Sequence, residues 1–337
     1  MLYAVFVEHL RESILATIVY YDILNFPLTL FEIKKFLIHP ARLRPAAQSS
    51  VEAPPSLSDI QKEIDGLAAA KKVVQQNGFY FLNGRNNLCV QRAEKEKISA
   101  QKWKKLLKAA RWFAAVPYLR GIFVGGSMAI NNTAEEGDFD ILAVARVGRL
   151  YTCRLFLSLA ASLFGARRKR FDKVAPDKFC FNHYIVDTVP GIEHQSLFNA
   201  QSYASLTPIL AGEELFEKFY GANEWIQNFI LSFEPSGKFV FKKIKPNPIL
   251  AETAKIGEAV FNSVFGGWLE KILKSVQQRR IRKNPVTYES GGRVVFSDSE
   301  LEFHPRSFEK TLVEQYNRGL KRTGILTAEQ ERDSGLN

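Results

Sequence analysis

Two short apolar segments constrain the fold most: the first ends in Gly-Gly-Ser, and the second begins Asp-Phe-Asp ten residues later. They occupy residues 121–127 and 138–144. Short apolar segments bounded by turn residues predict strands. Because side chains alternate across a strand, Asp138 and Asp140 should project from one face and Phe139 from the other.

The residue types at these two positions predict a site for a cation and a phosphate chain. Two carboxylates side by side repel one another, and Mg²⁺ compensates that repulsion while also binding phosphate oxygens of a substrate. Gly125 and Gly126 let the backbone approach a phosphate closely, and Ser127 can add a hydroxyl contact. We therefore predict Asp138 and Asp140 as catalytic metal ligands beside a nucleotide-binding turn, an arrangement suited to in-line phosphoryl or nucleotidyl transfer.

This segment resembles the polymerase-β-like nucleotidyltransferase superfamily, whose signature is an apolar residue, Gly-Ser, about ten residues and then Asp-apolar-Asp-apolar. The residues at 124–127 and 138–141 match it, with one additional glycine. The resemblance covers about residues 120–187, and the flanking regions look like those of uncharacterised bacterial proteins with an N-terminal winged helix. It implies a small mixed sheet with helices, a nucleoside triphosphate substrate, and Mg²⁺, or Mn²⁺ in its place, as cofactor.

Active members of that superfamily commonly carry a third carboxylate on a later strand, and this chain departs from the pattern. Residues 178–186 form the expected later strand and contain no acid. Asn182 takes the plausible inward position and is predicted as a third metal ligand, although an amide cannot accept a proton as a carboxylate does. His183 could assist proton transfer or form hydrogen bonds within the sheet, and Asp187 lies only at the strand's end.

Several arginines and lysines are candidate contacts for phosphate groups. Arg149 and Arg154 follow the second strand, where we expect a helix to begin near the metal, and a guanidinium there could clamp a triphosphate. The basic runs 167–170 and 277–283 either touch a polynucleotide backbone or are solvated charge.

The first 90 residues predict a winged-helix module. Helices are expected at 12–24, after a capping box at Thr29–Glu32, and after a second capping box at Ser58–Gln61. Pro, Ala and Ser residues at 39–55 suggest a flexible connection, and Asn77-Gly78 predicts a hairpin turn.

Three helices followed by a hairpin is the order of a winged helix, which often binds DNA through its third helix. The third helix here carries lysines at 62, 71 and 72 but also acids at 59, 63 and 65. A structural or protein-docking role is therefore as well supported as contact with nucleic acid.

The rest of the chain is expected to be mainly helical around the central strands. A helix at 92–113 precedes them, and helices with wide apolar stripes follow at 195–233 and 247–278, the latter broken at Gly266-Gly267. A late hairpin is expected at 294–303, followed by a helix at 308–319. We predict an α+β protein with a winged-helix-like module (1–90), a nucleotidyltransferase core (91–190) and a mainly helical C-terminal region (191–337).

The charge and the cysteines limit the partners and the setting of the protein. A net charge of +11 favours anionic partners without choosing among them. The chain has 3 cysteines and no CxxC pair, which favours free thiols in a reducing compartment. The most apolar run, 155–165, is too short to span a bilayer and predicts a buried helix. We expect a cytoplasmic protein without a membrane partner.

The predicted reaction is Mg²⁺-dependent transfer of a nucleoside monophosphate from a nucleoside triphosphate to a hydroxyl or phosphate acceptor. The acceptor could be a protein, a small molecule or an RNA. The alternative is a transferase fold that has lost catalysis and acts as a DNA-binding or ligand-sensing regulator, and a protein-binding scaffold is a third hypothesis.

Overall fold

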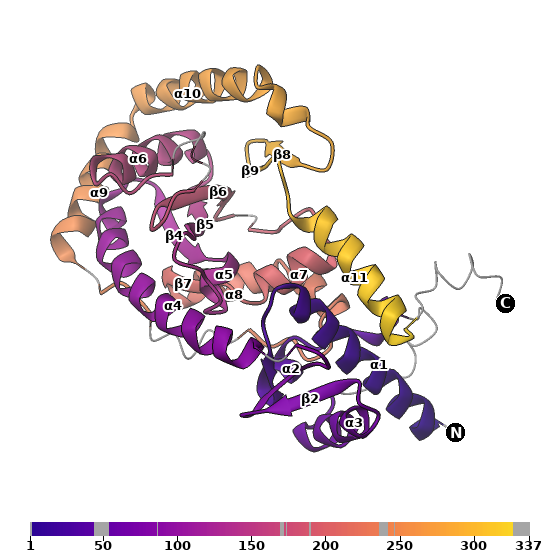
Figure 1. Cartoon of the computed structure of the whole chain (residues 1–337). Coiled ribbons are helices and arrows are strands. Elements are labelled where there is room, and N and C mark those ends of the chain that lie inside the picture. The colour runs from indigo at the N-terminus through magenta and orange to yellow at the C-terminus, as the bar shows by residue number, and fades with distance from the viewer. Residues whose placement is uncertain are drawn as a thin grey trace.

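The computed structural model describes residues 2–43, 54–85, 87–168, 172, 174–188, 190–235, 242–245 and 247–325. Within these ranges the chain has a mixed α+β fold, with a three-stranded and a six-stranded sheet among many helices (Figure 1). Most of the connection expected at 39–55, Lys169 and Arg170 of the basic run, and the C-terminal tail lie outside the described residues.

The described elements have the following bounds. The helices are α1 (Leu2–Ile23), α2 (Leu30–Lys35), α3 (Leu57–Ala69), α4 (Leu88–Ala110), α5 (Gly126–Ala129), α6 (Leu150–Leu163), α7 (Leu197–Tyr203), α8 (Glu213–Gly221), α9 (Pro248–Phe261), α10 (Val264–Arg282) and α11 (Glu309–Thr323). Short 3₁₀ turns are η1 (Pro40–Arg42), η3 (Arg111–Ala115), η4 (Glu224–Asn228) and η6 (Pro285–Tyr288). The strands are β1 (Leu28–Thr29), β2 (Val73–Gln76), β3 (Phe79–Leu82), β4 (Leu119–Val124), β5 (Phe139–Ala145), β6 (Phe179–Val186), β7 (Thr207–Leu210), β8 (Arg293–Phe296) and β9 (Glu300–His304).

The small sheet contains the predicted hairpin. Its strands are antiparallel in the order β1–β3–β2, and α1, α2 and α3 share a buried core beside it. The turn between β2 and β3 places Asn77 at φ 53° and Gly78 at φ 81°. Left-handed geometry at both residues gives a turn whose twist matches that of the strands, so the Asn-Gly prediction is confirmed.

Of the two capping boxes predicted in this region, one is present as predicted and the other lies at a different position. Thr29 and Glu32 form the predicted capping box of α2. The box predicted from Ser58 is wrong, because Ser56 caps α3 and its backbone N–H donates to the carboxylate of Asp59 at 3.0 Å. Helix α3 therefore begins at Leu57, ahead of the predicted position.

The large sheet draws strands from well beyond the expected core. Its order is β7–β4–β5–β6–β9–β8, with β5 and β6 parallel and the other neighbours antiparallel. The predicted late hairpin, β8–β9, forms and extends the sheet beside β6. Because β7, β8 and β9 all follow residue 190, the boundary expected there does not separate the sheet from the C-terminal region.

Helix α11 ties the end of the described chain to its beginning. Leu312, Tyr316 and Leu320 of α11 are buried in the core that α1 forms, and the rings of Tyr20 and Tyr316 lie 5.8 Å apart. Figure 1 shows the two helices side by side.

Helices cover both faces of the large sheet. Side chains of α4 and α6 pack against Phe139, Ile141 and Ala143 on one face. Side chains of α7 and α8 pack against Leu142 and Val144 on the other. Since side chains alternate along a strand, Asp140 shares the second face with Leu142 and Val144.

The apolar run that predicts a buried helix is only partly buried, and the apolar stripe expected at 247–278 is also exposed. In α6, which contains most of the apolar run 155–165, Leu159 and Leu163 are exposed because the helix covers the sheet with one side only. The helix break between α9 and α10 falls at Asn262–Ser263, and Gly266 and Gly267 lie inside α10. The apolar stripe along both helices is largely exposed. Among the described residues, no helix is both long and apolar enough to cross a bilayer.

Candidate functional site

The antiparallel pairing of β4 and β5 brings the glycine turn to the two aspartates. Val124 pairs with Ile141, and the backbone N–H of Gly125 donates to the carbonyl oxygen of Asp140 at 2.9 Å. The chain leaves β4 at Gly126 and forms the short helix α5 directly beside the start of β5. The predicted arrangement of turn and carboxylates is therefore present in the fold.

Gly126 is required where it stands. It has φ +59°, and a Cβ atom built on it would lie 2.2 Å from Oδ2 of Asp140. No other residue fits that approach without moving the carboxylate. Gly126 and Ser127 are exposed while Asp140 is partly buried, so the carboxylate faces an open turn.

Asp138 is paired with an arginine that the sequence did not single out. Nη1 of Arg168 donates to Oδ2 of Asp138, and the Asp138 side chain keeps 18% of its surface exposed. Arg168 reaches it because residues 166–168 pair with the start of β6: the N–H of Arg168 donates to Phe179, and the N–H of Phe179 donates to Ala166. Arg167 and Arg168, in an extended segment, point to opposite sides.

Asn182 lies at the site, beside Asp140. Its Nδ2 donates to Oδ1 of Asp140 at 2.8 Å. The strand β6 has one residue more than β5 between the pairs Asp140–Cys180 and Leu142–His183, and this bulge turns Asn182 toward the carboxylate. The hydrogen bond orients the carboxylate of Asp140, and ligation of a metal by the carbonyl oxygen of Asn182 stays a prediction.

The carboxyl group of Asp140 has a raised pKa, so it holds a proton more tightly than an ordinary aspartate does. Burial and the negative charge of Asp138 raise the pKa of Asp140 to about 6. The charges of His304 and Arg168 and the hydrogen bond from Asn182 act in the opposite direction. The dominant causes are burial and like-charge repulsion, both of which a bound divalent cation would relieve.

Cys180 completes the cluster where a third acid was sought. One ligand atom each of Asp138, Asp140 and Cys180 lies within 4.8 Å of the others. Burial, followed by the charges of Asp140 and Asp138, raises the pKa of the Cys180 thiol to about 12. The thiol is therefore neutral at physiological pH when no cation is bound, and in that state it does not act as a base.

Arg149 and Arg154 are not brought to the aspartates. Nη1 of Arg149 donates to the carbonyl of Gly266 at 2.8 Å, and Nη1 of Arg154 donates to the side chain of Gln277 at 2.6 Å. Both lie beyond the far end of β5, a strand roughly 20 Å long, so the expectation that the following helix begins near the metal is wrong. The two arginines hold α10 against α6.

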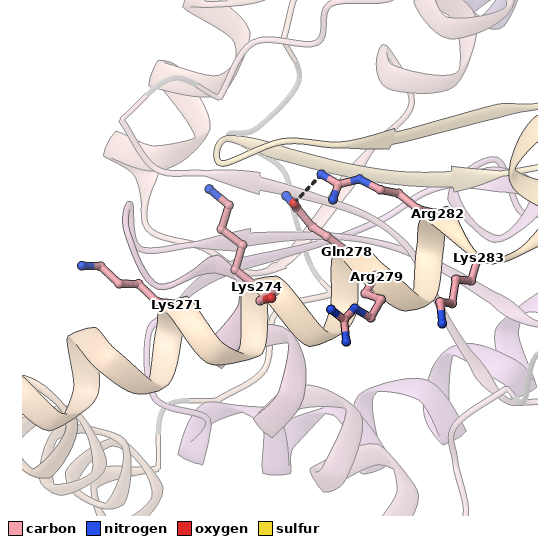
Figure 2. Close-up of a pocket in the computed structure, with 7 residues that line it drawn as sticks. Lys271, Lys274, Gln278, Arg279, Arg282 and Lys283 are labelled. Atoms are coloured by element: carbon pink, nitrogen blue, oxygen red, sulfur yellow. Dashed lines mark hydrogen bonds between the residues drawn. The ribbon is translucent and has the colours of Figure 1, made fainter.

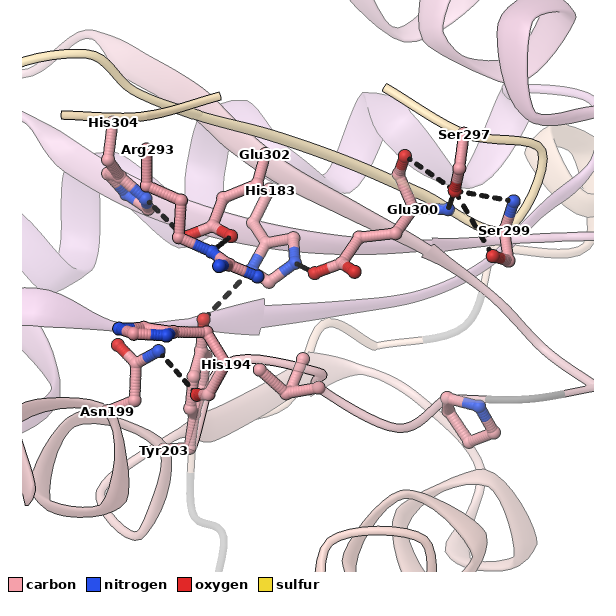
Figure 3. A network of polar contacts seen from close by, with 12 residues as sticks. His183, His194, Asn199, Tyr203, Arg293, Ser297, Ser299, Glu300, Glu302 and His304 are labelled. Atoms are coloured by element: carbon pink, nitrogen blue, oxygen red, sulfur yellow. Dashed lines mark hydrogen bonds and ion pairs between the residues drawn. The ribbon is translucent and has the colours of Figure 1, made fainter. Parts of the chain in front are cut away.

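His183 belongs to a buried polar network on the same face of the sheet (Figure 3). Its ring nitrogens lie 2.9 Å from the hydroxyl of Tyr203 and 2.9 Å from Oε1 of Glu300. Glu302, its neighbour across the strands, pairs with Arg293 and His304. The network satisfies His183 within the sheet, which is the second of the two roles considered for it.

Comparisons of the chain with protein-family models, with curated proteins and with solved structures give no match.

The sequence carried weak signals for the residues that were missed. Arg168 belonged to a basic run with nothing to distinguish it from its neighbours. Cys180 stands two residues before Asn182 on the strand that was searched for an acid, and a search for any ligand type would have included it.

Proposed function

We propose that the chain is a divalent-cation-dependent nucleotidyltransferase whose site is formed by Asp138, Asp140 and the turn at Gly125–Ser127. The observation that carries the proposal is the contact between Gly126 and Asp140, which keeps a glycine turn open beside a carboxylate pair on one strand face. A phosphate chain lying on that turn would meet the cation that the carboxylates hold.

The residues fit a hard divalent cation. Asp138 and Asp140 would hold Mg²⁺ or Mn²⁺, which when bound neutralises charge on the reacting phosphate oxygens. Burial, followed by repulsion from Asp138, raises the pKa of Asp140, and such an ion would offset both. The remaining side chains position these two: Asn182 orients Asp140, and Arg168 neutralises Asp138 until a cation arrives.

Arg168 has a second part in this proposal. Once a cation replaces it at Asp138, its guanidinium is next to the site and can bind the phosphates that the cation brings. Arg168 thereby takes the phosphate-binding role that was expected of Arg149 and Arg154.

The test is transfer or turnover of label from each α-labelled nucleoside triphosphate with Mg²⁺ or Mn²⁺. We expect Asp138→Ala/Asp140→Ala to lower the rate roughly 100-fold or more, the scale of a group needed in the transition state. Asp298→Asn, an exposed carboxylate on the β8–β9 turn, is the matched control and should retain the rate. Equal rates in all three proteins would refute the proposal.

The residues that stand in place of a third carboxylate favour one alternative, a catalytically inactive fold that senses a ligand or binds DNA. Cys180 and Asn182 stand where an acid would act as base, and neither takes a proton from an acceptor. In this alternative the nucleotide binds without turnover. Nucleotide-dependent thermal stabilisation without label transfer would support it.

The N-terminal elements support a winged helix through their order, α1–β1–α2–α3–β2–β3, and their sheet order, β1–β3–β2. The exposed face of α3 offers Lys62 together with Asp59 and Asp65, which does not suit a DNA backbone. We therefore propose a structural or protein-docking winged helix, tested by a salt-dependent mobility shift on short duplexes, in which sequence-preferring retention would contradict it.

A further inference from the structure

The corner between α9 and α10 exposes a group of large apolar side chains. The exposed fractions are 60% for Ile256, 59% for Val260, 94% for Val264, 54% for Phe265 and 58% for Trp268. We call these five residues the apolar corner. Single exposed apolar residues are ordinary, but a contiguous group of this kind marks an interaction surface.

The corner is held rigidly from behind. A Cβ atom on Gly266 would lie 1.5 Å from the carbonyl oxygen of Phe261, so a glycine is needed for the tight crossing of the two helices. Glu270 accepts the N–H groups of Tyr151 and Thr152 at 2.9 and 2.8 Å and fixes α10 to the start of α6. The inner side of α10 is therefore occupied, and its outer side presents the apolar corner.

Basic side chains continue along α10 where the apolar corner ends. A groove of about 550 Å³ is lined by Lys271, Lys274, Arg279, Arg282 and Lys283 (Figure 2). We call these five residues the basic groove. In Figure 1, α9 and α10 run along the outer rim of the molecule, on the side away from α1.

The apolar corner and the basic groove together indicate which kind of partner binds there. A second copy of this chain would bring its own basic groove to the same interface, and like charges oppose that contact. A nucleic acid would suit the basic groove, but the aliphatic side chains of Ile256, Val260 and Val264 offer nothing to phosphates or bases. A lipid surface with anionic headgroups suits both, because Trp and Phe enter the interface while Lys and Arg meet phosphates.

We propose that the outer side of α9 and α10 docks onto an anionic lipid surface, with the apolar corner entering the headgroup–acyl boundary and the basic groove receiving phosphate groups. The contact is peripheral and needs no membrane-crossing helix. It is independent of the proposed transferase activity.

The test is co-sedimentation of the full chain with vesicles of phosphatidylcholine alone or mixed with phosphatidylglycerol. We expect binding to the mixed vesicles only, reduced about tenfold or more by Arg279→Glu/Lys283→Glu and by Val264→Asp/Phe265→Asp. Lys97→Glu/Lys104→Glu, two exposed lysines of α4, makes the same change in net charge and should bind as the wild type does. Circular dichroism of each variant checks that it is folded.

A spectroscopic measurement locates the contact. Mixed vesicles should shift the tryptophan emission of the wild type to shorter wavelength, and Trp268→Phe should lose that shift although three tryptophans remain of the 4. Absence of binding, equal binding to neutral vesicles, or equal loss in the α4 control would overturn the proposal. Retention of single-stranded RNA by the basic groove without vesicle binding, or self-association through the corner, would overturn it in favour of that partner.

Discussion

Gly126 and Asp140 touch so closely that the backbone of one and the carboxylate of the other define a single surface, with 2.2 Å between Oδ2 and the place a Cβ would take. This contact links a turn at the end of β4 to a side chain near the start of β5. It fixes where a phosphate chain could lie relative to the carboxylates.

Gly126→Ala should therefore lower binding as well as stability, whereas alanine at another glycine in the left-handed region lowers stability alone. Gly165 has the same φ of +59° with nothing within 4 Å of its Cβ position, so Gly165→Ala reports the backbone cost alone. That cost is about 1 kcal/mol, visible as a lowered melting temperature in both variants. We expect only Gly126→Ala to lose cation and nucleotide binding in titration calorimetry, and equal effects would contradict the role of the contact.

Asp140→Asn should stabilise the cation-free protein at pH 8. The folded-state pKa of Asp140 is raised from 3.8 to about 6, so the folded protein binds this proton more tightly than the unfolded chain does. Its contribution to stability therefore falls as pH rises from about 4 to above 6. A shift of this size corresponds to roughly 2–3 kcal/mol.

The measurement is the free energy of unfolding at pH 4 and pH 8 without metal. Asp140→Asn should exceed the wild type at pH 8 and approach it at pH 4, while Asp298→Asn should follow the wild type at both. With Mg²⁺ and nucleotide present the order at pH 8 should reverse, because only the wild type gains from binding.

Glu302→Gln should have the opposite pH signature. Burial opposes the charge of Glu302, but the hydrogen bonds from His304 and Arg293 and the charge of His183 outweigh it and lower the pKa from 4.5 to about 2. Its stabilising contribution is complete above the unfolded pKa and is lost as pH falls from about 4.5 to 2.

Acid titration of the unfolding free energy tests this. The wild type should lose on the order of 2–3 kcal/mol more than Glu302→Gln across that range. Glu289→Gln, in which the exposed ion pair with Arg306 is broken, should track the wild type. Parallel curves for Glu302→Gln and the wild type would show that the polar network does not stabilise the ionised carboxylate of Glu302.

Much of the local structure could be predicted from neighbouring residues alone. The Thr29–Glu32 box, the Asn77-Gly78 turn and the strand carrying Asp140 depend on short-range chemistry, and all three are present, although the strand begins at Phe139 and Asp138 directly precedes it. Long-range contacts could not be predicted in this way. The pair Arg168–Asp138 arises from a segment that joins β6, and periodicity alone does not reveal that pairing.

The exposure of the apolar stripe of α9 and α10 could not be predicted for a related reason. A spacing of four residues, as between Ile256 and Val260 of α9, identifies one face of a helix but not what covers it. In this fold the opposite side of α10 carries Glu270 and packs on α6, which leaves the apolar residues outside.

Arg168→Ala should separate the two tasks assigned to that arginine. Removing the guanidinium frees Asp138, so Mn²⁺ should bind more tightly without nucleotide, by roughly fivefold for a partly exposed ion pair of about 1 kcal/mol. Binding of a nucleoside triphosphate should weaken, because a phosphate contact is lost. Arg167→Ala, the exposed neighbour, should change neither, and unchanged binding in Arg168→Ala would contradict the assignment.

The decisive measurement is the binding of Mn²⁺, followed by electron paramagnetic resonance with and without a non-hydrolysable nucleoside triphosphate. We predict one bound ion in the wild type whose affinity rises with nucleotide, and none in Asp138→Ala/Asp140→Ala. Equal binding by both proteins, or an ion whose affinity ignores the nucleotide, would contradict it.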